Sequence, residues 1–86
     1  RKPRILLVDP AGADRAAVRD ELIGAGHQVV VADDAMAAVE CLEQGPFDLV
    51  LTDLLLRDMS GVELAHYVRR HANGRATRVV VLSARD

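Results

Sequence analysis

Three polar residues stand at the ends of three apolar runs in this chain. Asp53 closes the run at 47–53, Asp9 follows the run at 4–8, and Ser83 follows the run at 78–82. Continuous Val and Leu without alternation is typical of parallel strands buried on both faces, so a charge should emerge only at a strand end. Because the carboxyl ends of parallel strands share one edge of a sheet, we expect the three side chains at one rim, where open α/β sheets bind ligands.

The two carboxylates at this rim suggest a cation site. Asp9 and Asp53 repel each other unless a proton or a cation lies between them. An oxygen-only site open to water suits Mg²⁺, which takes few protein ligands and keeps several waters. Ser83, on the neighbouring strand, could donate a hydrogen bond to whatever binds beside the metal.

The rest of the sequence alternates short apolar runs with amphipathic stretches, which predicts one α/β domain. Gly24 and Gly26 end the first helix, Gly45 in a left-handed conformation ends the second, and Ser60 with Glu63 forms a capping box on the third. Right-handed crossovers give one parallel sheet with helices on both faces and strand order 2-1-3-4. The predicted strands are 4–8, 27–32, 47–53 and 78–82. The first predicted helix is 13–25, the second runs from a cap at Asp33 or Asp34 to about residue 44, and the third runs from Ser60 to about residue 72.

Composition excludes several classes of protein. The 86 residues carry 11 Lys plus Arg against 13 Asp plus Glu, a net charge of −2, which gives no electrostatic reason to expect nucleic acid or an anionic membrane as a partner. Cys41 has no second cysteine to pair with and fits a reducing compartment. No apolar run approaches the roughly 20 residues of a membrane span. We therefore expect a cytoplasmic protein.

Four segments of the chain carry a recognisable pattern. They are Ile5-Leu6-Leu7-Val8-Asp9, Asp48-Leu49-Val50-Leu51-Thr52-Asp53, Met59-Ser60-Gly61-Val62-Glu63-Leu64 and Val81-Leu82-Ser83-Ala84-Arg85-Asp86. Together they resemble the response-regulator receiver domain, the phosphoacceptor module of two-component signalling. The resemblance covers the whole chain and implies a flavodoxin-like, doubly wound parallel sheet.

The resemblance implies a role for each residue of the rim. Asp53 matches the phosphoacceptor, which attacks a phosphohistidine of a sensor histidine kinase or phosphotransfer protein and becomes an aspartyl phosphate. Asp9, Asp53 and the backbone carbonyl of Leu55 match the Mg²⁺ ligands. Ser83 matches the switch hydroxyl, with small Ala84 beside it. The implied chemistry is self-catalysed phosphoryl transfer, so we do not expect an enzyme acting on a separate substrate.

The sequence departs from the family pattern at Pro10, where family members usually carry a second acid. Pro10 predicts weak Mg²⁺ binding, and it keeps open a pseudo-receiver that binds partners without phosphorylation. A hydrolase using an aspartyl phosphate ranks last, because its second Asp would stand at Leu55. Arg57 replaces a usual proline and is expected to face water, and Asp14 is expected to cap a helix or face solvent.

The last helix, strand and helix of the usual five-stranded receiver, with its lysine, have no counterpart in residues 1–86. We therefore expect an incomplete receiver domain over 1–86. If the chain ends there, the strand at 78–82 is a bare apolar edge, which is an aggregation hazard. A homodimer in which the chain borrows a strand from its neighbour would cover that edge.

Overall fold

The computed structural model describes residues 2–10, 13–71 and 76–82, in which strands and helices alternate. Each predicted element is present, so the βαβαβαβ order expected from the sequence is confirmed. In chain order the elements are β1 (Arg4–Val8), α1 (Ala13–Gly24), β2 (Gln28–Ala32), α2 (Ala35–Gln44), β3 (Leu49–Asp53), α3 (Gly61–Arg70) and β4 (Arg78–Leu82).

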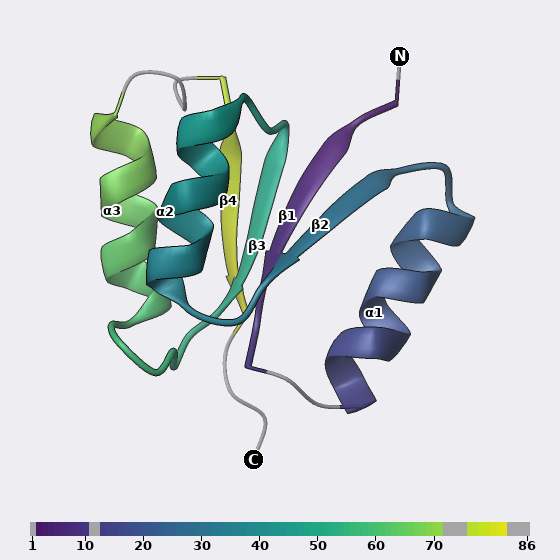
Figure 1. The fold of residues 1–86 in the computed structure, drawn as a ribbon, viewed down its shortest axis with the longest axis horizontal. Coiled ribbons are helices and arrows are strands. Elements are labelled where there is room, and N and C mark those ends of the chain that lie inside the picture. The colour runs from purple at the N-terminus through teal and green to yellow at the C-terminus, as the bar shows by residue number, and fades with distance from the viewer. Residues whose placement is uncertain (1, 11–12, 72–75, 83–86) are drawn as a thin grey trace.

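The four strands form one sheet in the order β2-β1-β3-β4, and every pair is parallel. α1 covers one face of the sheet, while α2 and α3 lie side by side on the other (Figure 1). This is the doubly wound, flavodoxin-like arrangement predicted from the sequence. The order reverses between β1 and β3, so the switch point of the sheet lies between these two central strands.

The main core lies between the sheet and the α2–α3 layer. Leu6, Val8 and Val50 are completely or almost completely buried there against Leu64 and Val68 of α3. Burial of this kind is the dominant stabilising term in a small domain. The central strands β1 and β3, which end next to Asp9 and at Asp53, are therefore anchored in this core.

The opposite face is covered unevenly. Ile5 and Leu7 of β1 are buried, but Val80 and Leu82 of β4 are 43% and 41% exposed. The strand register places these residues on one face of the sheet. Leu51 pairs with Leu7 of β1 and with Val80 of β4, and paired side chains share a face. α1 lies over β2, which leaves this face open at the β4 end.

The predicted signals at the end of α1 and at the starts of α2 and α3 are confirmed, with Asp34 as the N-cap of α2. At the end of α1, Gly26 has a φ of 99°, and the amides of Gly26 and His27 bond back to Ile23 and Leu22, which is a Schellman motif. At the start of α3, the Ser60 hydroxyl and the Glu63 carboxylate accept each other's backbone N–H at 3.1 Å, which confirms the capping box.

The prediction of a left-handed Gly45 is wrong. Its φ of 168° is extended backbone, which leads directly into Pro46 and needs no left-handed residue. Four boundaries also shift. α1 ends at Gly24 and not at residue 25. β2 begins at Gln28, because the His27 amide is used in the α1 cap, and β3 begins at Leu49. α3 ends at Arg70, with His71 as its C-cap.

Candidate functional site

Asp9 and Asp53 lie next to each other at the carboxyl ends of the two central strands. Val8 of β1 pairs with Thr52 of β3, and the two aspartates are the next residues on each chain. Strand alternation puts both on the α1 side of the sheet, in line with Leu7 and Leu51. Both are half-buried. The structure thus places the two aspartates at adjacent strand ends, as the sequence predicted.

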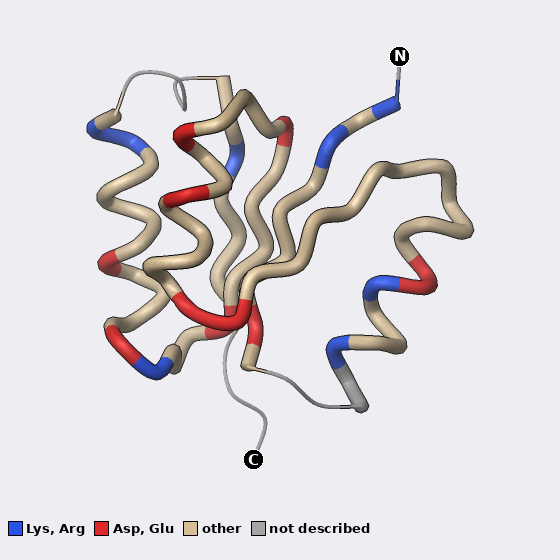
Figure 2. The backbone as a smooth tube through the Cα atoms, in the orientation of Figure 1, with Lys and Arg blue, Asp and Glu red and all other residues tan. Residues whose placement is uncertain are grey.

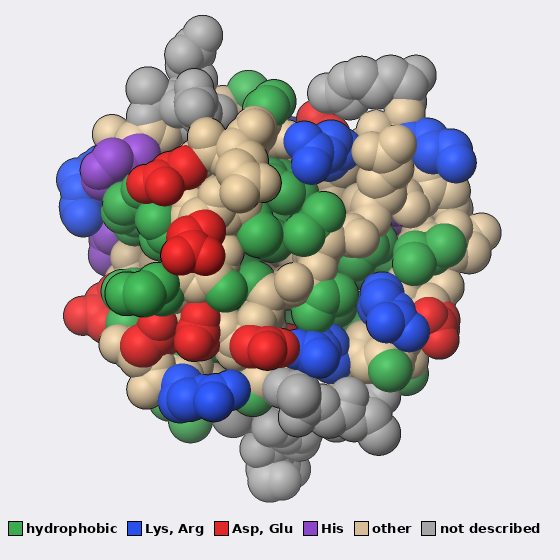
Figure 3. All heavy atoms as spheres, in the orientation of Figure 1, with side chains coloured by type: hydrophobic (Ala, Val, Ile, Leu, Met, Phe, Trp, Pro, Cys, Tyr) green, Lys and Arg blue, Asp and Glu red, His purple; other side chains and the backbone are tan. Residues whose placement is uncertain are grey.

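Acidic residues gather along this rim beyond the central pair. Figure 2 shows acidic backbone positions clustered at the carboxyl ends of the strands, and Figure 3 shows acidic side chains in a band there with basic side chains beside it. Such a concentration of negative charge favours cations over anions.

The backbone around Asp53 is held closely. Asp53 is the last residue of β3, and its Oδ1 accepts the Leu54 N–H at 3.0 Å. The Leu54 N–H also donates to the Leu82 carbonyl of β4 at 3.0 Å. Gly61, the first residue of α3, packs so tightly that a Cβ there would lie 2.3 Å from the Asp53 carbonyl oxygen. Only a glycine fits this approach of α3 to the end of β3.

The loop after Asp53 folds back on itself as a small hairpin, with Leu55 opposite Ser60 in an antiparallel pair. The bonds of this pair are made by the flanking residues, from Gly61 N–H to the Leu54 carbonyl at 2.7 Å and from Leu56 N–H to the Met59 carbonyl at 3.1 Å. In a pair of this type the opposed residues do not bond to each other, so the Leu55 carbonyl is turned away from Ser60. It is therefore not used in the ladder of its own loop.

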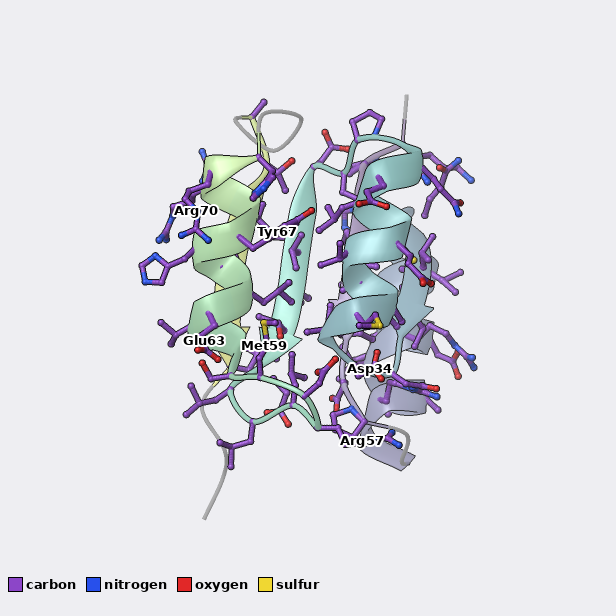
Figure 4. All side chains as sticks on the ribbon, turned by 60° about the vertical axis from the view of Figure 1, so that its left-hand side comes forward. Asp34, Arg57, Met59, Glu63, Tyr67 and Arg70 are labelled. Carbon is purple, nitrogen blue, oxygen red and sulfur yellow. The ribbon has the colours of Figure 1, made fainter. Side chains whose placement is uncertain are left out.

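Asp58, at the tip of this hairpin, reaches the N-terminus of α2. Its Oδ1 accepts the Ala35 N–H at 3.0 Å and its Oδ2 accepts the Met36 N–H at 2.9 Å. Figure 4 shows the neighbouring Arg57 and Asp34, the residue before α2, at the same end of the molecule. The bond from Ala35 is the main cause that lowers the pKa of the Asp58 carboxyl. Desolvation opposes it, and the bond from Met36 and the charge of Arg57 add to the lowering.

Neither Asp58 nor Arg15, which lies on the other side of the rim, was predicted from the sequence to take part in the site. The Asp9 N–H continues the sheet by donating to the Ala32 carbonyl at 3.0 Å. Arg15, from the first turn of α1, donates to the Asp9 carbonyl at 3.1 Å and forms an ion pair with Asp33. Arg15 appeared in the sequence only as a polar position of an amphipathic helix, so nothing pointed to its contact with the rim.

Several predicted residues lie outside the described part of the chain. Ser83 and Ala84 follow the end of β4 and are among these, as is the side chain of Asp14, so their predicted roles stay predictions. Arg57 is exposed, as expected. Pro10, next to Asp9, is half-buried and offers neither a carboxylate nor a backbone N–H to the rim.

The donor set of the rim fits Mg²⁺ better than a softer metal. Among residues 2–10, 13–71 and 76–82, no three His, Cys, Asp or Glu side chains form a metal cluster. The ligands predicted from the sequence are two carboxylates, Asp9 and Asp53, and the Leu55 carbonyl, all oxygen donors. Mg²⁺ is commonly held by one or two carboxylates and keeps several waters, whereas zinc sites need nitrogen or sulfur ligands in a closed set.

The doubly wound fold with two acids at its switch point can be compared with known proteins. A family model described as the response regulator receiver domain matches residues 5–86. The chain therefore belongs to the response regulator receiver domain family.

Individual relatives come from both kinds of two-component protein. The chain is 37% identical over 84 residues to the sensor histidine kinase TmoS of Ectopseudomonas mendocina, covering 98% of this chain and 8% of that protein. It is 39% identical over 62 residues to the response regulator receiver protein CpdR of Brucella abortus, covering 72% of this chain and 52% of that protein. The chain thus spans about half or less of these relatives.

Among solved structures, the receiver domain of the sensor histidine kinase PA1611 from Pseudomonas aeruginosa superposes with a TM-score of 0.89 at 26% identity, covering 98% of this chain and 69% of that one. That structure has a magnesium ion coordinated in its active site cleft. In the described part of the present chain, no helix has the length and apolar character needed to cross a bilayer.

Proposed function

We propose that this receiver domain takes a phosphoryl group onto Asp53 from a phosphohistidine of a sensor histidine kinase or a phosphotransfer protein. A carboxylate oxygen of Asp53 forms the new bond to phosphorus as the bond from phosphorus to the histidine nitrogen breaks. The histidine leaves as a neutral imidazole after taking up a proton. The products are an aspartyl phosphate on this chain and an unmodified histidine on the partner.

The observation that carries this proposal is the adjacency of Asp9 and Asp53 at the switch point of the sheet. Phosphoryl transfer needs positioning and charge neutralisation more than covalent assistance. Asp9, Asp53 and the Leu55 carbonyl would hold Mg²⁺, which neutralises charge on the phosphoryl oxygens. The chain's own contribution is to hold Asp53 in one place, through the Leu54 amide and the close approach of Gly61.

The same proposal makes the domain a phosphoprotein of a phosphorelay and not an enzyme with a separate substrate. Its relatives include both sensor histidine kinases and response regulators, which supports either partner. The unpaired Cys41 supports a cytoplasmic location, where thiols stay reduced.

Intact mass spectrometry tests the proposal directly. The protein is incubated with acetyl phosphate or a phosphoramidate and Mg²⁺, and a mass increase of about 80 Da, that of an added HPO₃ group, is expected. The adduct should disappear in Asp53→Ala and persist in the matched variant Asp20→Ala, which removes an exposed carboxylate of α1. An adduct that survives in Asp53→Ala would place the reaction elsewhere and overturn the assignment.

One observation favours a second candidate, a pseudo-receiver that binds partners without taking phosphate. Pro10 stands where the family usually has a second acid, so the rim holds two charged donors instead of three. Absence of the adduct at every Mg²⁺ concentration, in a protein that is shown to be folded, would support this candidate over the first.

A further inference from the structure

Asp58 joins two elements that are distant in sequence. It lies at the tip of the hairpin formed by residues 55–60, and its two carboxylate oxygens accept the N–H groups of Ala35 and Met36 at 3.0 and 2.9 Å. The next amide of α2, that of Ala37, is bound by Asp34 at 2.9 Å. Three consecutive amides in the first turn of α2 are thus bound by two carboxylates, one local and one from the loop after the acceptor strand.

The capping of α2 does not by itself explain Asp58. Asp34 is already the N-cap of this helix, with the extended backbone and the bond to Ala37 that a cap requires. A second carboxylate beside it brings in like-charge repulsion, which the positive end of the helix dipole offsets. The additional effect of Asp58, which Asp34 cannot have, is to hold the hairpin against α2.

The hairpin that Asp58 holds carries the proposed site. Its two internal bonds connect the loop only to itself and to the start of α3, from Leu56 to Met59 and from Gly61 to Leu54. Leu56 and Met59 pack on the core, but apolar contacts do not fix a loop in one direction. A carboxylate bound by two N–H groups is directional, and it acts three residues from the Leu55 carbonyl and five from Asp53.

We propose that Asp58 is a positioning residue of the acceptor site, which holds the hairpin on α2 and thereby fixes the Leu55 carbonyl relative to Asp53. The role of the Leu55 carbonyl in this statement rests on the proposed function. The attachment of the hairpin by Asp58 does not rest on it.

Amide hydrogen exchange on the full chain, without added metal, tests the attachment. Asp58→Ala is compared with Asp34→Ala, because both remove a carboxylate from the same helix end and only the first also removes the link to the hairpin. In Asp58→Ala the Leu56 and Gly61 amides should exchange about tenfold faster or more than in Asp34→Ala, as expected when a charged hydrogen bond no longer opposes local opening. Asp58→Asn, which keeps an acceptor oxygen, should fall between.

Equal exchange of these two amides in Asp58→Ala and Asp34→Ala would overturn the proposal and leave Asp58 as a second helix cap. A Mg²⁺ titration then measures the consequence at the site, where Asp58→Ala should bind the ion several-fold more weakly than Asp34→Ala. If the parent protein binds no Mg²⁺, the proposed function loses its metal, while the exchange comparison still decides the attachment.

Discussion

The two halves of the rim, one after β3 and one after β1, are built differently. After β3 the chain turns back as a hairpin that is held at its tip by Asp58, at its base by the capping box of α3, and beneath by Gly61 against the Asp53 carbonyl. After β1 the chain continues into Pro10. The contacts of this half include the bond from the Asp9 amide to β2 and the bond from the Arg15 guanidinium to the Asp9 carbonyl.

The two halves differ in how well they meet the two requirements of phosphoryl transfer, which are positioning of the nucleophile and neutralisation of charge. Positioning the nucleophile depends on packing and directional bonds, and the half after β3 has both. Charge neutralisation depends on a bound Mg²⁺, and the affinity for Mg²⁺ depends on the number of acidic ligands. The half after β1 lacks the acid that the family usually has at the position of Pro10. Asp53 is therefore held by several directional contacts, but Asp9 is the one predicted acidic metal ligand beside it.

The largest effect is expected from Gly61→Ala, which should disrupt the packing of α3 against the end of β3. The added Cβ would meet the Asp53 carbonyl oxygen, a backbone atom that cannot move aside. We expect a loss of about 1–3 kcal/mol in the free energy of unfolding, measured by urea denaturation, because forced overpacking costs this much. Adduct formation on Asp53 should fall as well, since the backbone that carries the carboxylate must shift.

Gly24→Ala is the matched control for that measurement. Gly24 ends α1, and a Cβ there meets nothing within 4 Å. Alanine should stabilise the protein by about 0.5–1 kcal/mol, because it lowers the entropy of the unfolded chain and suits a helix. A Gly61→Ala variant as stable as the parent would show that the close approach of α3 to β3 is not needed.

The next largest effect is expected from Pro10→Asp, which should strengthen Mg²⁺ binding by the half of the rim after β1. A further carboxylate beside Asp9 should lower the Mg²⁺ dissociation constant by on the order of tenfold, measured by calorimetric titration, since affinity for hard cations rises with the charge of the ligands. Pro10→Ala removes the ring without adding charge and should leave the dissociation constant unchanged. If the two variants bind Mg²⁺ equally well, the proline ring and not the missing acid limits the site.

The smallest expected effect is a change in stability with pH at Asp58. Its pKa is lowered in the folded state, so its contribution to stability is complete above the unfolded pKa of about 3.9 and is lost as the pH falls through the lower folded value. Urea denaturation of the parent and of Asp58→Asn should therefore differ at pH 7 and converge at the acidic end, below about pH 4. Comparing the two proteins cancels the titration of every other acid, and a difference that persists unchanged in acid would contradict the assignment.

Much of the fold could be predicted from the sequence because the signals are local. Runs such as 78–82, Gly26 after α1, and the Ser60–Glu63 pair each determine their own backbone, and all three are confirmed. Gly45 shows the limit of this reasoning. A glycine before a proline permits a left-handed cap but does not require one, and here the chain stays extended.

The site was predictable where it follows from strand ends and not where it depends on contacts between distant loops. Asp9 and Asp53 meet because parallel strands share an edge, which a sequence pattern reveals. The contacts of Asp58 with α2 and of Arg15 with the Asp9 carbonyl depend on how loops separated in sequence approach each other. No local pattern encodes that approach, so both residues looked like ordinary surface charges.

The strand order described above also has a consequence for how the chain folds. β1, which is synthesised before the other three strands, lies in the middle of the sheet and completes its pairing only when β3 is available, more than 40 residues later. Because pairing between distant segments must first overcome the entropy of closing the loop between them, this step is expected to limit the folding rate. Asp9 and Asp53 sit at the end of that pairing, so the rim forms only when the slowest contact of the sheet has been made.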